Sequence, residues 1–515
     1  MKKSLLLYSL MAILLNLSCS PEKPEVAIEA HRPAFHFSPP AKWMNDPNGM
    51  VYYEGEYHLF YQYYPDSTVW GPMHWGHAVS TDLVHWEHLP IALYPDEQGW
   101  IFSGSAVIDH NNTSGLGSPE QPPMVAIYTY HNAPREKEGY DDFQTQGIAY
   151  SLDKGRTWTK YPGNPVLPNP GIRDFRDPKV RWYAPAQKWI MALAVQDHIA
   201  FYSSPNLIEW GHESDFGQEL GAHGGVWECP DLFPLAHPSE AGQKWVLLVS
   251  INPGGPNGGS ATQYFIGDFD GTSFTPDQPL STRWIDFGRD NYAGVTWSNA
   301  PETDGRTLFM GWMSNWQYAQ VVPTDNWRSA MTLPRQLQLL PSAEGISLAA
   351  SPAAELTALR QQTRDIPAQT LGGTLQLVEP GSPSGTLLEL ELELELPENP
   401  GTVIHIRRSN ALGEQYTLSF DTANNGWFSD RRQAGKTDFS TEFATATSFA
   451  PRNILDNKLS LRLFFDVASV ELFADGGLSN LSEIFFPRED FTGLTLEISG
   501  DPVVITRGAV HTLGQ

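Results

Sequence analysis

Ser80-Thr-Asp-Leu-Val-His-Trp86 closes a β-branched and aromatic run with a turn and a tryptophan. Similar copies stand at Ser151-Leu-Asp-Lys-Gly-Arg-Thr-Trp158, Ser204-Pro-Asn-Leu-Ile-Glu-Trp210 and Gly267-Asp-Phe-Asp-Gly-Thr-Ser-Phe274. Their intervals of roughly 50–70 residues equal about one four-stranded blade of a β-propeller. The region from residue 31 to about residue 341 would then hold about five blades. The alternative is a sandwich that repeats one kind of β-turn.

The amino-acid composition agrees with an all-β chain, and the net charge makes some classes of binding partner unfavourable. Lys plus Arg number 33 against 59 Asp plus Glu, which gives a formal net charge of −26. Such a field repels phosphate, so nucleic acid and anionic membrane surfaces are poor candidates for partners. A hydrophobic fraction of 41% suffices for sizeable cores, and 44 Gly with 41 Pro favour short strands joined by tight turns. Two Cys rule out a disulfide framework.

The N-terminus has the pattern of an export signal. Two lysines precede residues 5–17, which are almost wholly apolar but too few to span a bilayer. Ser18-Cys19 follows where a bacterial lipoprotein signal places its lipidated cysteine, although Asn16 occupies a position where Leu is usual. We expect residues 1–19 to be a signal peptide of the lipoprotein type and residues 20–30 a tether; cleavage at another nearby position is the alternative. The expected location is the cell envelope, the periplasm or the cell exterior, with no transmembrane span.

A helix and an alternating strand mark a change after the repeats. Ser351-Pro-Ala-Ala-Glu-Leu-Thr-Ala-Leu-Arg360 has a Ser suited to an N-cap and a Pro at the first helical position. As a strand, Leu388-Glu-Leu-Glu-Leu-Glu-Leu-Glu-Leu396 places Leu on one face and Glu on the other, which is typical of a sheet half buried and half wet. We predict a five-bladed propeller in residues 31–345, a linker with a short helix in 346–364 and a β-sandwich in 365–515.

Three acids lie among aromatic, Asn and Pro residues. Asp46 is in Trp43-Met-Asn-Asp-Pro-Asn-Gly49, Asp177 in Asp174-Phe-Arg-Asp-Pro178, and Glu228 in Gly224-Gly-Val-Trp-Glu-Cys-Pro-Asp231. Glycoside cleavage needs two carboxyls on opposite sides of one bond. Aromatic rings offer flat faces to sugars, and amides hydrogen-bond hydroxyls. One Asp-Pro is a weak signal. One acid per blade length, however, directs all three at a single central cavity.

These stretches resemble the motifs of glycoside hydrolase family 32, the β-fructosidases, and especially its bacterial levanases and exo-inulinases. The resemblance runs from residue 31 to 330 and continues more weakly to the end. The matching stretches are His36-Phe-Ser-Pro-Pro-Ala-Lys-Trp-Met-Asn-Asp-Pro-Asn-Gly49, Tyr57-His-Leu-Phe-Tyr-Gln-Tyr63, Trp70-Gly-Pro-Met-His-Trp-Gly-His77, Phe102-Ser-Gly104, Phe175-Arg-Asp-Pro178, Glu228-Cys-Pro-Asp231, Gly311-Trp-Met-Ser-Asn-Trp316 and Phe465-Asp-Val-Ala-Ser-Val-Glu-Leu-Phe-Ala-Asp-Gly476. Members of the family have a five-bladed propeller followed by a β-sandwich.

The resemblance implies a role for each acid. Asp46 matches the nucleophile that attacks C2 of a terminal fructose, Glu228 the acid/base, and Asp177 the acid that stabilises the transition state. The positions that match the fructose-binding site are Trp43, Asn45, Gln62, Trp70, Phe102, Ser103, Arg176 and Trp312.

The implied function is an exo-acting fructan hydrolase that releases terminal fructose from levan or inulin, and from sucrose, by a retaining double displacement. One alternative is an invertase-type β-fructofuranosidase that prefers sucrose. Another is a non-catalytic fructan-binding surface protein, which would have no reason to keep all three acids. The expected partner is a neutral fructan or fructo-oligosaccharide, and the family needs neither a cofactor nor a metal.

Three further signals each have a structural interpretation that needs no special chemistry. His74 and His77 have a spacing that suggests zinc, but residues three apart on a strand face opposite sides, so we expect no metal site. Cys229 is either a packed small residue or a group that tunes Glu228. Asp231 is either an acid behind the site or a strand cap.

Overall fold

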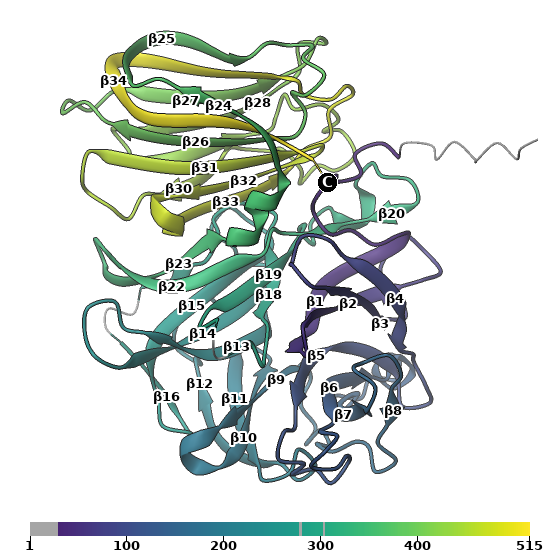
Figure 1. Ribbon diagram of the computed structural model, residues 1–515. Helices are drawn as coiled ribbons and strands as arrows, with labels where there is room; N and C mark the ends of the chain where they lie inside the picture. The colour runs from purple at the N-terminus through teal and green to yellow at the C-terminus, as the bar shows by residue number, and fades with distance from the viewer. Residues whose placement is uncertain (1–28, 278–280, 302–303, 515) are drawn as a thin grey trace, which may run out of the picture.

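The computed structural model describes residues 29–277, 281–301 and 304–514, which form a lower and an upper body in Figure 1. The expected signal peptide, Cys19 and most of the tether lie outside the described residues. Within the described part of the chain, no helix combines the length and apolar character that a membrane span requires.

The lower body is the five-bladed propeller that the sequence predicts, with antiparallel sheets around a common axis (Figure 1). The first blade contains β1 (Lys42–Tyr53), β2 (Glu56–Tyr64), β3 (His74–Ser80), β4 (Glu87–Leu93) and, beside β1, the late strand β20 (Trp327–Arg328). The second contains β5 (Trp100–Ile108), β6 (Met124–His131), β7 (Gln144–Ser151) and β8 (Thr159–Lys160). The third contains β9 (Phe175–Tyr183), β10 (Lys188–Val195), β11 (His198–Ser204) and β12 (Gly211–Phe216).

The fourth blade contains β13 (Val226–Ala236), β14 (Gln243–Asn252), β15 (Ala261–Phe269), β16 (Phe274–Pro276) and β17 (Arg283–Trp284). The fifth contains β18 (Tyr292–Thr296), β19 (Thr307–Met313), β21 (Ala330–Met331), β22 (Arg335–Ser342) and β23 (Gly345–Pro352). Short helices α1 (Ala133–Lys137), η1 (Ala184–Ala186) and η2 (Ala319–Val321) lie between strands. Because β20 pairs with β1, the last blade is tied back to the first and the ring closes.

The recurring turn joins the third strand of a blade to the fourth. Asp82 Oδ1 accepts hydrogen bonds from the backbone N–H groups of Val84 and His85, which fixes the reversal of the chain. The indole N–H of the closing tryptophan then donates to the carbonyl three residues earlier: Trp86 to Leu83, Trp158 to Gly155, and Trp210 to Leu207. The repeat is therefore visible in the sequence because the first three blades close this turn with the same indole hydrogen bond.

The upper body is a sandwich of two sheet layers linked by one long strand, β34 (Gly493–Leu513). One layer contains β25 (Gln369–Val378), the first half of β34, β27 (Val403–Ser409), β28 (Gln415–Asp421), β29 (Gly426–Asp430) and β30 (Ser448–Pro451). The other contains β24 (Arg360–Ile366), the second half of β34, β26 (Leu388–Glu395), β31 (Lys458–Asp466), β32 (Ser469–Ala474) and β33 (Ser479–Ile484), with η4 (Asp475–Gly477) after β32. Apolar side chains from both layers form one core.

Two local expectations need correction. The linker helix is a 3₁₀ helix, η3 (Ala354–Leu359), because Ser351 and Pro352 pair with β22 as the end of β23 and are not available as a cap. On β26 the Leu row is buried as predicted, but Glu389 on the other face is buried too and pairs with Arg360 and Arg462. The strand pattern was right, and the expectation that every Glu meets water was wrong.

A buried ion network joins the propeller to the sandwich. His36, in the segment before β1, contacts Asp466 Oδ2 at 2.7 Å through Nδ1 and Glu471 Oε1 at 2.9 Å through Nε2. Arg335 of the fifth blade bonds Glu471 and Asp286. Burial disfavours a charged ring, but the hydrogen bonds and negative charges of Asp466 and Glu471 outweigh burial and raise the pKa of His36 to about 9.

We expect His36→Asn to lower the free energy of unfolding by about 3–5 kcal/mol near pH 6, because two buried carboxylates lose their shared cation. A raised pKa stabilises the fold fully below the unfolded value near 6.5, and this contribution is lost as pH rises through about 9. Unfolding measured between pH 6 and 10 should therefore show the gap between the wild type and the variant closing at high pH. A gap independent of pH would contradict the charged state of His36; the same substitution at exposed His110 is the control.

Candidate active site

The innermost strand of every blade carries a β-bulge at the same level of the channel. In each case two residues oppose one residue of the neighbouring strand: Asn45-Asp46 in β1, Phe102-Ser103 in β5, Asp177-Pro178 in β9, Cys229-Pro230 in β13 and Ala293-Gly294 in β18. A bulge bends its strand and changes the direction of nearby side chains. Four of the five bulges carry a polar side chain, so polar groups from four blades gather at one end of the axis.

The backbone at three of these bulges adopts the left-handed region. Asp177 has φ 63°, Cys229 φ 45° and Ala293 φ 53°. The first two precede Pro178 and Pro230, which have no N–H to lose from the strand ladder. The Asp-Pro and Cys-Pro pairs in the sequence thus mark where the inner strands leave regular pairing.

The bulges open on a pocket of about 290 Å³. Its lining residues are Asn45, Asp46, Gln62, Trp70, Phe102, Ser103, His131, Glu136, Phe143, Gln144, Asp174, Arg176, Asp177, Glu228, Asn252 and Trp316. One wall is aromatic, with Trp70 edge-on to Phe102 and His131 stacked on Phe102 at 4.3 Å between ring centroids. Trp316, which packs against Trp43 and Trp312, also lines the pocket. Flat rings beside carboxyls and amides suit a sugar.

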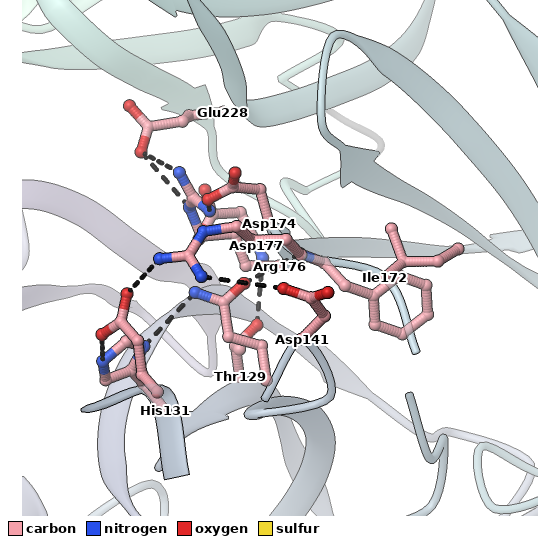
Figure 2. A network of polar contacts seen from close by, with 12 residues as sticks. Thr129, His131, Asp141, Ile172, Asp174, Arg176, Asp177 and Glu228 are labelled. Atoms are coloured by element: carbon pink, nitrogen blue, oxygen red, sulfur yellow. Dashed lines mark hydrogen bonds and ion pairs between the residues drawn. The ribbon is translucent and has the colours of Figure 1, made fainter. Parts of the chain in front are cut away.

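Glu228 is held from both sides. Arg176 donates to Glu228 Oε1 through Nη2 at 2.9 Å, and its Nη1 donates to Asp174 at 2.6 Å (Figure 2). The Tyr292 hydroxyl donates to the other oxygen, Oε2. The carboxyl of Glu228 therefore has a fixed orientation at the edge of the pocket.

The Cys229 thiol lies between the carboxyls of Asp177 and Asp46. The Cys229 Sγ lies 3.6 Å from Asp177 Oδ2 and 4.0 Å from Asp46 Oδ2, and the Cys229 N–H donates to Asp177 at 3.1 Å. Burial and the three surrounding carboxyls raise the pKa of Cys229 well above its ordinary value, so the thiol keeps its proton. Cys229 is thus a packed small residue that also donates to both acids. The Ser103 hydroxyl lies 3.4 Å from Asp46.

The carboxyl cluster retains a proton near neutral pH. Burial, followed by the charge of Glu228, raises the pKa of Asp46 to about 7. Burial also raises the pKa of Asp177 to about 6, against the opposing effect of Arg176. Carboxyls this close titrate as one group. A site that holds one proton among several acids is equipped for acid/base chemistry.

Farther along the inner strands, an ion pair joins neighbouring blades. Lys179 of β9 lies 3.0 Å from Asp231 of β13, and the same Asp231 oxygen accepts bonds from the N–H and hydroxyl of Thr296 in β18. Three blades are thereby joined directly. Asp231 therefore links neighbouring blades. The two interpretations drawn from the sequence, an acid behind the site and a strand cap, did not include this contact.

The structure brings together most of the residues expected at the site. Asn45, Asp46, Gln62, Trp70, Phe102, Ser103, Arg176, Asp177 and Glu228 all line the pocket. Trp43 and Trp312 are fully buried and stand behind Trp316, with ring centroids 5.8 and 5.0 Å from it. Trp316 belongs to a quoted motif and was recoverable from it. His131, Glu136, Gln144, Asn252 and Tyr292 carried no such signal.

Paired carboxyls and aromatic walls at the end of a five-bladed propeller define a glycoside hydrolase. Residues 36–352 match the model of the glycosyl hydrolases family 32 N-terminal domain, and residues 355–511 match that of the family's C-terminal domain. The chain belongs to glycosyl hydrolase family 32.

Named relatives agree with this assignment. The chain is 48% identical to a levanase of Bacillus subtilis, over 100% of this chain and 75% of that protein. It is 37% identical to an extracellular exo-inulinase of Aspergillus niger, over 94% and 95% of the two chains. The crystal structure of an exo-inulinase from Aspergillus awamori is similar with a TM-score of 0.85 and 35% identity, covering 94% of this chain and 99% of that one.

Proposed function

We propose that the protein is an exo-acting fructan hydrolase that releases terminal fructose from levan, inulin or both, and from sucrose. The observation that carries the proposal is the pocket itself, where Asp46, Asp177 and Glu228 from three blades meet beside aromatic walls. Relatives named levanase and exo-inulinase support fructan as the substrate class.

The residues suit a retaining double displacement. Asp46, with one oxygen free of partners among the described residues, attacks C2 of the terminal fructose and forms a covalent fructosyl-enzyme. Glu228 gives a proton to the leaving oxygen and then takes one from the attacking water. Asp177 stabilises the positive charge that develops on the ring. Arg176 and Tyr292 both donate to Glu228 and hold its carboxyl in place for both steps.

Exo cleavage follows from the shape of the channel. The contact among Lys179, Asp231 and Thr296 forms a floor beneath the acids. The residues that line the pocket do not overlap with those that line a second cavity of about 880 Å³, to which Lys179, Asp231 and Thr296 belong. A chain end can enter a pocket with a floor, but a polymer interior cannot pass through it.

The earliest products on levan and inulin, resolved by chain length, test this proposal. We expect free fructose alone at low conversion, because each cut removes the terminal unit. A ladder of oligomers would show cleavage inside the chain and overturn the exo assignment. The invertase alternative predicts a higher kcat/KM for sucrose than for either fructan, measured in the same assay.

We also propose that the chain is exported and lipidated on Cys19. The supporting pattern is the lysine pair, the apolar segment and Ser18-Cys19. Metabolic labelling with a radioactive fatty acid should mark the wild-type protein and not Cys19→Ala; equal labelling of both would exclude this anchor.

A further inference from the structure

A carboxylate outside the catalytic trio faces the same pocket. Glu136 lies on α1, in the connection between β6 and β7 of the second blade, and lines the pocket with the three acids. Its side chain is about one third exposed, at 35%. The scheme above gives it no task, because nucleophile, acid/base and stabilising acid are already supplied.

Glu136 is held in place by donors on two sides. Arg173 Nη2 donates to Glu136 Oε1 at 2.9 Å, and His131 Nε2 lies 3.1 Å from Glu136 Oε2. Burial, followed by the charges of Arg176 and Arg173, lowers the pKa of His131 to about 4, so the ring is neutral. The Gln144 amide donates to His131 Nδ1 at 3.3 Å, which leaves the ring proton on Nε2, toward Glu136.

This chain of contacts begins at β9, the strand that carries Arg176 and Asp177. The N–H of Phe175, next to Arg176 in β9, donates to Gln144 Oε1 at 2.8 Å, so hydrogen bonds connect β9 through Gln144 and His131 to Glu136. His131 is also stacked on Phe102 of the aromatic wall. The position of the Glu136 carboxylate is thus set by the elements that form the pocket, and both of its oxygens remain hydrogen-bond acceptors.

We propose that Glu136 binds hydroxyls of the sugar on the leaving side of the scissile bond and so determines preference for a carbohydrate leaving group. The inference rests on the proposed function. The terminal fructose is surrounded by Asp46, Asp177 and the aromatic wall, and the next sugar must lie toward the open rim where Glu136 is exposed. A fixed carboxylate accepts charge-assisted hydrogen bonds from sugar hydroxyls.

Substrates with and without a leaving sugar provide the test. We would measure kcat/KM for an inulin-type trisaccharide, a levan-type trisaccharide and p-nitrophenyl β-fructofuranoside with the wild type, Glu136→Ala and Glu136→Gln. The loss of one or two charge-assisted hydrogen bonds should lower kcat/KM on the trisaccharides by about 10- to 100-fold. The aryl fructoside, which has no leaving sugar, should change by less than about threefold, and this retained activity shows that the variants fold.

Parallel losses on all three substrates would overturn the inference, since Glu136 would then only support His131 and the wall. No loss on either trisaccharide would overturn it as well. Glu138→Ala is the matched control, because Glu138 follows at the C-cap of α1 and is exposed. A wild-type chain that cleaves the aryl fructoside but neither trisaccharide would instead overturn the proposed function, and the inference with it.

Discussion

Asp46→Ala is expected to lower kcat on fructans by roughly 10⁴- to 10⁶-fold, as removal of a nucleophile that acts within a catalytic group does in other hydrolases. No neighbouring group can take over the attack, because Asp177 is turned toward the Cys229 N–H and Glu228 is held by Arg176. The fold should survive, since the Asp46 carboxyl lies 3.4 Å from the Ser103 hydroxyl and 4.0 Å from the Cys229 thiol, distances at which hydrogen bonds are weak. Removing one of three crowded acids should, if anything, relieve repulsion.

Initial rates of fructose release and thermal unfolding, measured on the same preparations, check this result. Asp66→Ala is a suitable control, because Asp66 is an exposed acid in the turn after β2. A correctly folded Asp46→Ala protein with activity close to that of the wild type would remove Asp46 from the mechanism.

The architecture was predictable wherever one local pattern repeats. In the first and third blades the Asp or Asn of the turn bonds backbone groups within three residues, and the closing Trp bonds the carbonyl three residues back, so the whole turn is encoded in about seven positions. The strict Leu–Glu alternation of β26 likewise encodes a strand with one buried face. Glu389 was expected to face water but is buried, because it pairs with Arg360 and Arg462, which come from other strands.

The catalytic acids were accessible to sequence reasoning because their bulges carry a local mark, the proline after Asp46, Asp177 and Cys229. The groups that orient them have no such mark. Tyr292 reaches Glu228 across 64 positions of the chain, and Lys179 reaches Asp231 from the neighbouring blade. Such contacts depend on how the blades close into a ring, which no window of sequence contains.

Glu228→Ala should have unequal effects on natural and activated substrates. Fructans need their leaving oxygen protonated, so their hydrolysis should fall by about 10²- to 10⁴-fold, the usual contribution of a general acid. p-Nitrophenyl β-fructofuranoside has a leaving group that departs without protonation, so its first step should be largely spared. Water attack on the fructosyl-enzyme then becomes slow, because the base is missing. Azide, which needs no base, should restore turnover and yield fructosyl azide.

The pH profile of the same variant supplies a second, independent readout. The charge of Glu228 is one of the causes that raise the pKa of Asp46 to about 7, so its removal should lower the Asp46 pKa. Activity on the aryl fructoside requires ionised Asp46, and the acid limb of kcat/KM should therefore move to lower pH in Glu228→Ala. Equal damage to both substrates, no azide product and an unmoved acid limb would together show that Glu228 is not the acid/base.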